Sequence, residues 1–160
     1  MAGTVARELK QAKPFSSTEQ EVLLGLQLAA NRTMEPWTNF LKSNAALTTN
    51  QYNALRILRG AHPTRLTCSE IVERMVTRDP DVTRLLYRLE RRGLVDRVRS
   101  SSDRRIVEVG ITPEGLDLLK TLDPAVERMP RVVLGHLGPA KLRLLQELLE
   151  AVMMRVGAFP

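Results

Sequence analysis

The chain of 160 residues contains few of the side chains that bind metals or form disulfides. It has one cysteine, Cys68, so it can form neither an intramolecular disulfide nor a cysteine-based zinc site. Its two histidines, His62 and His136, are too few for a convincing metal cluster. The sequence therefore predicts a protein that holds no metal and needs no cofactor.

Long apolar runs are also missing from the sequence. No run approaches the ~18 residues that a helix needs to span a bilayer. Residues 1–17 are polar and lack the apolar core of a signal peptide. We expect these residues to form a flexible N-terminal arm, and we expect the protein to be cytoplasmic.

Sequence motifs of enzymes are missing as well. The chain has no glycine-rich phosphate loop, no metal-ligand spacing and no nucleophile motif of the usual kinds. Its composition, with 43% apolar and 26% charged residues, is ordinary for a folded domain. At this length the chain can bury one full core, with or without an appended element. We therefore expect a folded binding protein that has no catalytic residues and is not an enzyme.

Arginine is the residue that the sequence has in excess. The formal net charge is +6, and 19 of the 24 basic residues are arginine. The segment from Arg78 to Arg105 holds nine arginines against five acidic residues, which supplies four of the six net charges. The planar guanidinium suits phosphates and guanine edges. Because basic surfaces are common, it is the concentration of arginine in one segment that points to nucleic acid.

Capping residues predict where the helices begin. A long first helix begins near Ser17 or Thr18 and extends to about Ala45, with Pro36 predicting a kink or a break inside it. The later helices begin at Thr48 or Thr49, at Thr67 in a Thr-x-x-Glu capping box, at Asp79–Pro80, at Thr112–Pro113 and near Pro139.

The last two of these helices have features of their own. Pro124 and Pro130 predict that the helix beginning at Pro113 is kinked or split. The helix that begins near Pro139 is rich in leucine on more than one narrow face. That pattern predicts burial on two sides rather than a surface helix.

The helix predicted from about Asp79 to Gly93 has two different faces. Its apolar face carries Val82, Leu85, Leu86 and Leu89 at helical spacing. The other side presents Thr83, Arg84, Tyr87, Arg88 and Arg91. One α-helix fits the major groove of DNA, where arginine can pair bidentately with guanine. A solvated amphipathic helix is the alternative interpretation.

A basic hairpin follows this helix. Two strands, residues 94–99 and 106–111, flank a small polar tip, and valines alternate along the second strand. Around the tip stand Arg97, Arg99, Arg104 and Arg105. Arginine at a protruding tip suits the minor groove, where the negative potential is enhanced. An ordinary charged hairpin is the alternative.

In this order and spacing, these pieces resemble the MarR family of bacterial winged helix-turn-helix regulators. The residues that carry the resemblance are Leu47–Gln51, Val82–Leu85, Leu89–Val95, Asp103–Arg105 and Ile111–Gly115. The resemblance covers roughly residues 18–156. Two departures stand out, and neither concerns the fold. Tyr87 stands where the family commonly has an acidic residue, which bears on base preference. Pro36 interrupts a helix that is usually continuous, which bears on the sensor side.

The resemblance implies a mainly α fold with a small β-wing. A winged helix-turn-helix domain at 48–111 would lie between an N-terminal dimerisation helix at 18–47 and C-terminal dimerisation helices at 112–160. The implied function is a homodimeric transcriptional regulator, by default a repressor, that binds double-stranded DNA at a pseudo-palindromic operator. Two-fold symmetry places its half-sites one helical turn apart, roughly 10 bp. A dimeric winged helix scaffold without DNA binding is the alternative.

The resemblance also implies which side chains contact DNA. Thr83, Arg84 and Arg88 would face the major groove, together with Tyr87 on the same side of the helix. In the wing, Arg104 or Arg105 would reach the minor groove, with Arg99 beside them and Asp103 holding the wing arginine in place.

Family members often bind a small aromatic or phenolic effector between the dimerisation helices and the winged domain. The candidates for such a pocket are Trp37, Phe40, Tyr52 and Arg56, although the aromatic residues also suit the core and Arg56 the surface. Some relatives instead sense oxidants through a cysteine. Cys68 stands in the first turn of a predicted helix, a place typical of reactive thiols, but a lone cysteine is also a common small core residue.

Overall fold

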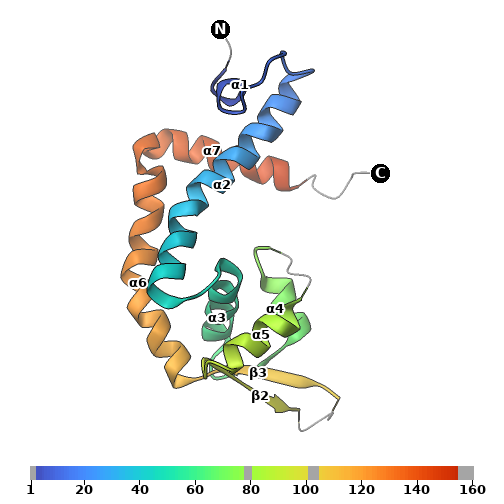
Figure 1. The fold of residues 1–160 in the computed structure, drawn as a ribbon, viewed down its shortest axis with the longest axis vertical. Coiled ribbons are helices and arrows are strands. Elements are labelled where there is room, and N and C mark those ends of the chain that lie inside the picture. The colour runs from blue at the N-terminus through green and yellow to red at the C-terminus, as the bar shows by residue number, and fades with distance from the viewer. Residues whose placement is uncertain (1–2, 78–80, 101–104, 155–160) are drawn as a thin grey trace. The chain divides into compact units, whose positions relative to one another are not determined.

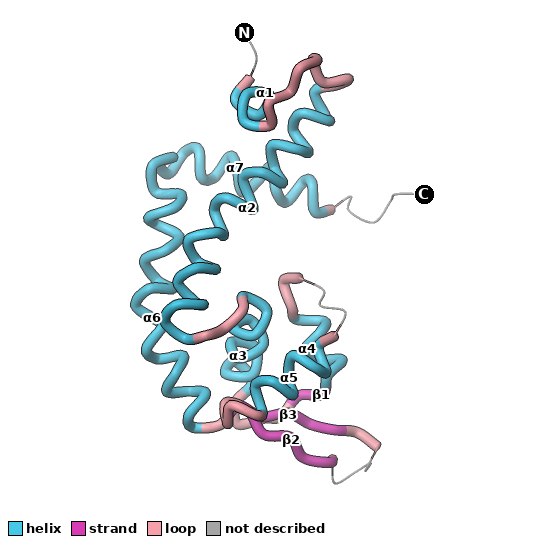
Figure 2. The backbone as a smooth tube through the Cα atoms, viewed as in Figure 1, coloured by secondary structure: helices cyan, strands magenta, loops and turns pink. Residues whose placement is uncertain are grey.

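The computed structural model describes residues 3–77, 81–100 and 105–154 (Figure 1). Its elements are α1 (Thr4–Glu8), α2 (Thr18–Ala45), α3 (Thr49–Ala61), β1 (Leu66–Thr67), α4 (Cys68–Arg74), α5 (Val82–Glu90), β2 (Val95–Arg99), β3 (Val107–Ile111), α6 (Pro113–Leu134), a 3-10 turn (Gly135–Leu137) and α7 (Gly138–Met153). Figure 2 shows that helices dominate and that the strands gather in one small sheet. The prediction of a mainly α fold with a small β-wing is confirmed.

The chain divides into two compact units, Met1–Leu119 and Lys120–Pro160. The predicted winged helix-turn-helix region, residues 48–111, lies within the first unit. None of the helices in the described ranges is long and apolar enough to cross a membrane.

The long helix α2 begins where its cap predicts and runs through its proline. The hydroxyl of Ser17 accepts a hydrogen bond from the backbone N–H of Gln20 at 3.2 Å. The helix is continuous from Thr18 to Ala45, so the predicted break at Pro36 is wrong. A proline removes one N–H donor and crowds the carbonyl four residues earlier, which can kink a helix without ending it. Burial of Trp37 and Leu41 holds this part of α2 against the core.

The N-terminal arm, expected to be flexible, contains the short helix α1. Glu8, the last residue of α1, forms an ion pair with Arg32 on α2. Both side chains are largely exposed, and exposed pairs of this kind contribute little to stability.

Two capping boxes begin helices at the predicted residues. Thr48 caps α3, and Oε1 of its partner Gln51 accepts a hydrogen bond from the Thr48 backbone N–H at 2.9 Å. Thr67 caps α4 in the same way with Glu70, at 2.8 Å. Each box satisfies backbone donors that a helix start leaves free.

Helix α5 begins later than predicted. Its N-cap is Asp81, whose carboxylate accepts from the backbone N–H of Arg84 at 3.1 Å. The predicted cap, Asp79 with Pro80, lies outside the described residues, and the backbone at Asp81 is not helical. Two aspartates stand two residues apart at this helix start, and the one adjacent to Val82 is the cap.

The three strands form one antiparallel sheet in the order β1-β3-β2. The predicted hairpin is confirmed, with Val95 opposite Ile111 and Arg99 opposite Val107. Strand β1 was not predicted, because two residues are too few to show an alternating pattern. Its Leu66 pairs with Val109 on β3, which puts the start of α4 beside the hairpin.

The segment Thr112–Gly115 joins the hairpin to α6 through a tight contact. The Thr112 hydroxyl donates to the carbonyl of Gly93 at 2.7 Å and accepts from the N–H of Gly115 at 3.1 Å. A Cβ atom on Gly115 would lie only 2.3 Å from the Leu94 carbonyl oxygen. Only glycine allows this approach, so the Thr-x-x-Gly spacing locks the start of α6 onto the end of the α5 turn.

Helices α6 and α7 correct two expectations. Helix α6 is continuous through Pro124 and Pro130, so the predicted split is wrong. Helix α7 begins at Gly138 with Pro139 in its first turn, as predicted. None of its residues is buried in the described chain, however, so the predicted burial on two sides is not found within this chain.

Candidate nucleic-acid interface

Helix α5 separates its residues into two faces as the periodicity predicts. Val82, Leu85, Leu86 and Leu89 are buried, with Leu86 and Leu89 fully enclosed. The four residues predicted to read DNA, Thr83, Arg84, Tyr87 and Arg88, are all exposed. Tyr87 has half of its surface accessible, at 51%. The buried face fixes the helix, and the exposed face presents two guanidiniums, a hydroxyl and a phenol.

A shallow groove of about 320 Å³ runs beside this face. Arg84 and Arg88 line it from α5, and Thr48 to Gln51 line it from the first turn of α3. The N-terminus of a helix carries a partial positive charge. The carboxylate of Asp81, which caps α5, also lines the groove. Two arginines and a helix N-terminus outweigh this one negative charge, so the arrangement suits a backbone phosphate.

Two other arginines of the basic segment have structural partners. Arg92 donates to the backbone carbonyls of Ala45 and Ala46 at the end of α2, both at 2.8 Å. Arg97 is half-buried and lies 3.5 Å from the carboxylate of Glu90. Counting arginines along the sequence therefore overstates the charge that the segment presents to a ligand.

The wing is described at its base and along both strands. Arg99 is exposed at the end of β2, and Arg105 is exposed just before β3. The backbone N–H of Ser100 donates to the carbonyl of Ile106 at 2.9 Å, which closes the described part of the hairpin. Asp103 and Arg104 lie outside the described residues.

An ion pair on the sheet was not predicted from the sequence. Arg65, just before β1, donates through Nη1 to Oδ1 of Asp96 at 2.8 Å and through Nη2 to Oδ2. Hydrogen bonds from Arg65 lower the pKa of the Asp96 carboxyl, and the same bonds raise the pKa of Arg65. The two residues are 31 positions apart, so no local pattern could have joined them.

The candidate effector residues are only partly brought together. A cavity of about 400 Å³ is lined by Trp37, Tyr52 and Arg56, but not by Phe40. Phe40 stacks on Trp37 instead, with ring centroids 5.4 Å apart. The structure therefore brings three of the four candidate residues to this cavity and places Phe40 against one of them.

The cavity also contains a polar residue that the sequence did not single out. Asn53 is 8% exposed, and its Oδ1 accepts from Nη2 of Arg56 at 3.1 Å. Its Nδ2 is buried and makes no hydrogen bond within the described structure. Trp37 and Tyr52 meet edge to face at 5.1 Å and form an aromatic wall beside it. One buried donor, one guanidinium and two rings therefore face the same space.

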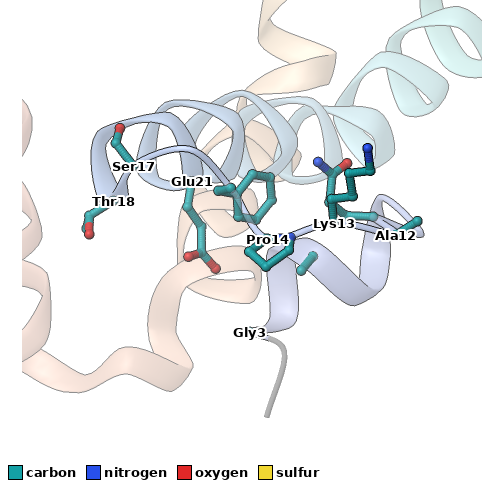
Figure 3. Close-up of a pocket in the computed structure, with 10 residues that line it drawn as sticks. Gly3, Ala12, Lys13, Pro14, Ser17, Thr18 and Glu21 are labelled. Atoms are coloured by element: carbon teal, nitrogen blue, oxygen red, sulfur yellow. The ribbon is translucent and has the colours of Figure 1, made fainter.

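The remaining candidate features are Cys68, a hollow beside α1 and the potential metal ligands. Cys68 is the first residue of α4, half-buried and not disulfide-bonded. A larger hollow of about 650 Å³ lies between α1, the following loop and the first turn of α2 (Figure 3). Lys13 and Glu21 are the charged residues in its lining, which is otherwise small, apolar or uncharged. Among the described residues, no three potential metal ligands come together.

Comparison with known proteins identifies the family. A family model described as MarR family matches residues 47–107. The homoprotocatechuate degradative operon repressor of Escherichia coli is 30% identical over 104 residues, 65% of this chain and 69% of the relative. The crystal structure of a MarR transcription factor from Planctomyces limnophilus is 39% identical, with a TM-score of 0.65 and coverage of 86% of this chain and 99% of that one.

The DNA binding of a third relative is regulated by a small molecule. BpsR of Bordetella bronchiseptica, studied for regulation of its DNA binding by 6-hydroxynicotinic acid, is 25% identical, with a TM-score of 0.72 and coverage of 83% and 98%. The residues that the family model matches include the whole of α5 and of β2. The chain therefore belongs to the MarR family and is a transcriptional regulator, not an enzyme.

Proposed function

We propose that this protein is a cytoplasmic repressor of transcription that binds double-stranded DNA as a homodimer. The exposed face of α5 carries the proposal. Thr83, Arg84, Tyr87 and Arg88 stand on that face, while the opposite face is buried in the core. The helix is thereby held rigidly with its polar side outward, which is what insertion into the major groove requires.

The neighbouring elements fit the same docked arrangement. With α5 in the major groove, a phosphate of the flanking backbone would lie in the groove lined by Arg84, Arg88 and the first turn of α3. The wing would enter the adjacent minor groove through Arg99, Arg104 and Arg105, with Asp103 holding a wing arginine.

Exposed apolar residues support the homodimer. On α7, Leu144, Leu148 and Val152 are 55%, 57% and 48% exposed. On α2, Val22 and Leu23 are exposed to a similar degree. Clustered exposed apolar residues mark interaction surfaces. We assign both surfaces to a second copy of the chain, which gives two recognition helices related by two-fold symmetry.

Selection of genomic fragments with the purified protein tests this function. We expect a pseudo-palindrome with half-sites roughly 10 bp apart to be enriched. The logarithm of its binding constant should fall linearly with the logarithm of the salt concentration. The slope of that line, the salt slope, should be about −0.9 for each phosphate contacted. Failure to enrich any sequence, together with a binding constant insensitive to salt, would favour a dimeric scaffold instead.

We further propose that a small aromatic carboxylate releases the protein from DNA. The cavity beside Trp37 and Tyr52 has about 400 Å³, within the range of small-molecule sites. Its aromatic wall suits a planar ring. The guanidinium of Arg56 and the buried amide of Asn53 suit a carboxylate and a ring hydroxyl. Regulation of the related BpsR by 6-hydroxynicotinic acid supports this choice of chemistry.

A titration of the protein–operator complex with salicylate and with 6-hydroxynicotinic acid tests the effector. We expect at least one compound to dissociate the complex, and Arg56→Ala to weaken that response by about tenfold or more, the loss of one charge-assisted hydrogen bond. Arg131→Ala removes the same charge from α6, which does not line the cavity, and should respond as the wild type does. Equal responses of the two variants would place the effector elsewhere.

A further inference from the structure

The Arg65–Asp96 pair crosses the sheet rather than joining neighbouring strands. Arg65 precedes β1 and Asp96 is on β2, while β3 lies between these two strands. Both terminal nitrogens of the guanidinium meet both carboxylate oxygens, and Nη1 also lies 3.5 Å from the Asp96 carbonyl oxygen. A bidentate pair of this kind fixes the relative orientation of the guanidinium and the carboxylate as well as the distance between them.

Gly110 makes this crossing possible. It lies on β3 directly opposite Asp96 in the strand register. A Cβ atom at this position would lie 2.9 Å from Oδ1 of Asp96 and 3.0 Å from Nη1 of Arg65. These are the ends of the two side chains, so any larger residue would displace the pair and not the backbone. Arg65, Asp96 and Gly110 thus form one unit, which we call the sheet clamp.

The sheet clamp joins two parts of the predicted DNA-binding surface. Strand β1 leads directly into α4, the first helix of the helix-turn-helix. Strand β2 follows α5 and leads to the wing residue Arg99. Arg99 is three residues beyond Asp96, roughly 10 Å along an extended strand. A rotation of about 10° at the clamp would therefore move Arg99 by about 2 Å, enough to break a hydrogen bond.

We propose that Arg65, Asp96 and Gly110 position the wing on DNA by clamping β2 to the strand that begins the helix-turn-helix. This inference rests on the proposed DNA-binding function. The three residues are positioning residues: they set where Arg99 and its neighbours meet the phosphates, without making those contacts themselves.

Removing a negative charge in two matched ways tests the clamp. Asp96→Asn and Glu114→Gln each raise the net charge by one, and Glu114 is an exposed residue in the first turn of α6, outside the sheet. If DNA binding depended only on net charge, both variants would bind DNA at least as tightly as the wild type. The clamp instead predicts that Asp96→Asn misplaces the wing and weakens binding by about tenfold, near the lower end of the loss expected when one DNA contact is missing. It also predicts that the salt slope flattens by about one unit, because one phosphate contact is lost.

The expected result for Glu114→Gln is an affinity equal to or above that of the wild type, with an unchanged slope. Arg99→Ala should weaken binding in the wild-type background and should have a smaller effect beside Asp96→Asn, because the wing is already misplaced. An Asp96→Asn variant that binds as the wild type does, with the same slope, overturns the clamp. Wild-type protein that binds no DNA overturns the proposed function instead.

Two further variants keep the test decisive if Asp96→Asn does not fold. Arg65→Lys retains the charge but cannot form a bidentate pair, and it should flatten the salt slope in the same direction. The exchange Arg65→Asp with Asp96→Arg restores opposite charges and should recover part of the lost affinity. Each variant is compared at temperatures where circular dichroism shows it folded. Full affinity for Arg65→Lys and none regained by the exchange would also overturn the proposal.

Discussion

Helices α5 and α7 both present one side to solvent, but they differ in what lies on it. Helix α5 has nine residues, four of them buried, and its exposed side is polar and cationic. Helix α7 has 16 residues, none of them buried, and exposes leucine and valine. Arginine in water suits a polyanion, whereas leucine in water suits another apolar surface. The exposed face of each helix thus indicates the chemistry of its partner.

The two helices also begin differently. Asp81 caps α5 through a hydrogen bond to the N–H of Arg84. Helix α7 follows Leu137, which provides no side-chain cap, and relies on Pro139 in its first turn. Short helices are marginal in water unless they are packed against something. Helix α5 is therefore stabilised by packing within the described chain, whereas no residue of α7 is buried there.

The largest effect is expected from a core residue of α5. Leu86 is fully buried, so Leu86→Ala leaves a cavity and should lower the free energy of unfolding by about 2–5 kcal/mol. Urea denaturation followed by circular dichroism measures this loss. A change below about 1 kcal/mol would mean that α5 is not anchored by its apolar face.

Truncating exposed leucines of α7 should act on assembly instead. The double substitution Leu144→Ala with Leu148→Ala removes apolar surface from both copies of the chain in the proposed dimer. We estimate that this loss weakens the free energy of dimerisation by about 2–3 kcal/mol. Sedimentation at a series of concentrations should show dimers dissociating at roughly 100-fold higher concentration than in the wild type. If the association constant stays the same, α7 is not part of the dimer interface.

The exposed face of α5 should matter for DNA and not for folding. Arg84→Ala should weaken operator binding by ~1–3 kcal/mol and relax the preference at one base pair. Arg143→Ala is the matched control, because it removes the same charge from an exposed position on α7. Mobility-shift titrations at fixed salt compare the two. If the two variants lost the same operator affinity, the affinity would depend on the net charge of the protein and not on the position of Arg84.

The smallest effect concerns the pH dependence of the capped helices. Hydrogen bonds from the backbone and hydroxyl of Thr67 hold the pKa of Glu70 below its ordinary value of 4.5. Because the folded pKa is lowered, the ionised carboxylate contributes stability above pH 4.5, and this contribution is lost as the pH falls through the lowered pKa.

Glu70→Gln removes this titration while keeping an acceptor in the capping box. Its melting temperature should lie slightly below that of the wild type near neutral pH, and the gap should close in acid. Thermal unfolding between neutral pH and acid measures the gap. A gap of constant size throughout this range would show that Glu70 does not stabilise α4 through its charge.

Local signals in the sequence predicted local structure well. The cap at Thr48, the capping box at Thr67 and the start of α6 after Thr112 each depend on side chains within a few residues of the backbone they bind. The division of α5 into two faces follows from helical spacing alone. These features need no knowledge of the rest of the fold.

Features that depend on distant partners could not be predicted in this way. The bond from Arg92 to Ala45 and Ala46, and the pair between Arg65 and Asp96, join residues that the fold brings together. The predicted breaks at prolines, as distinct from kinks, were wrong for a related reason. Pro36, Pro124 and Pro130 each lower the local preference for helix, but the helices that contain them are long enough to continue past one missing hydrogen bond.

The space above Gly110 has a consequence for evolution. A Cβ atom there would lie 2.9 Å from the Asp96 carboxylate and 3.0 Å from the Arg65 guanidinium, so a side chain at position 110 would push the ends of both residues aside. A homologue that gains such a side chain must shift the ion pair, and selection to keep its arginine and aspartate is then relaxed. Across a sufficiently deep alignment, these three positions should therefore change together, although 31 residues separate the arginine from the aspartate.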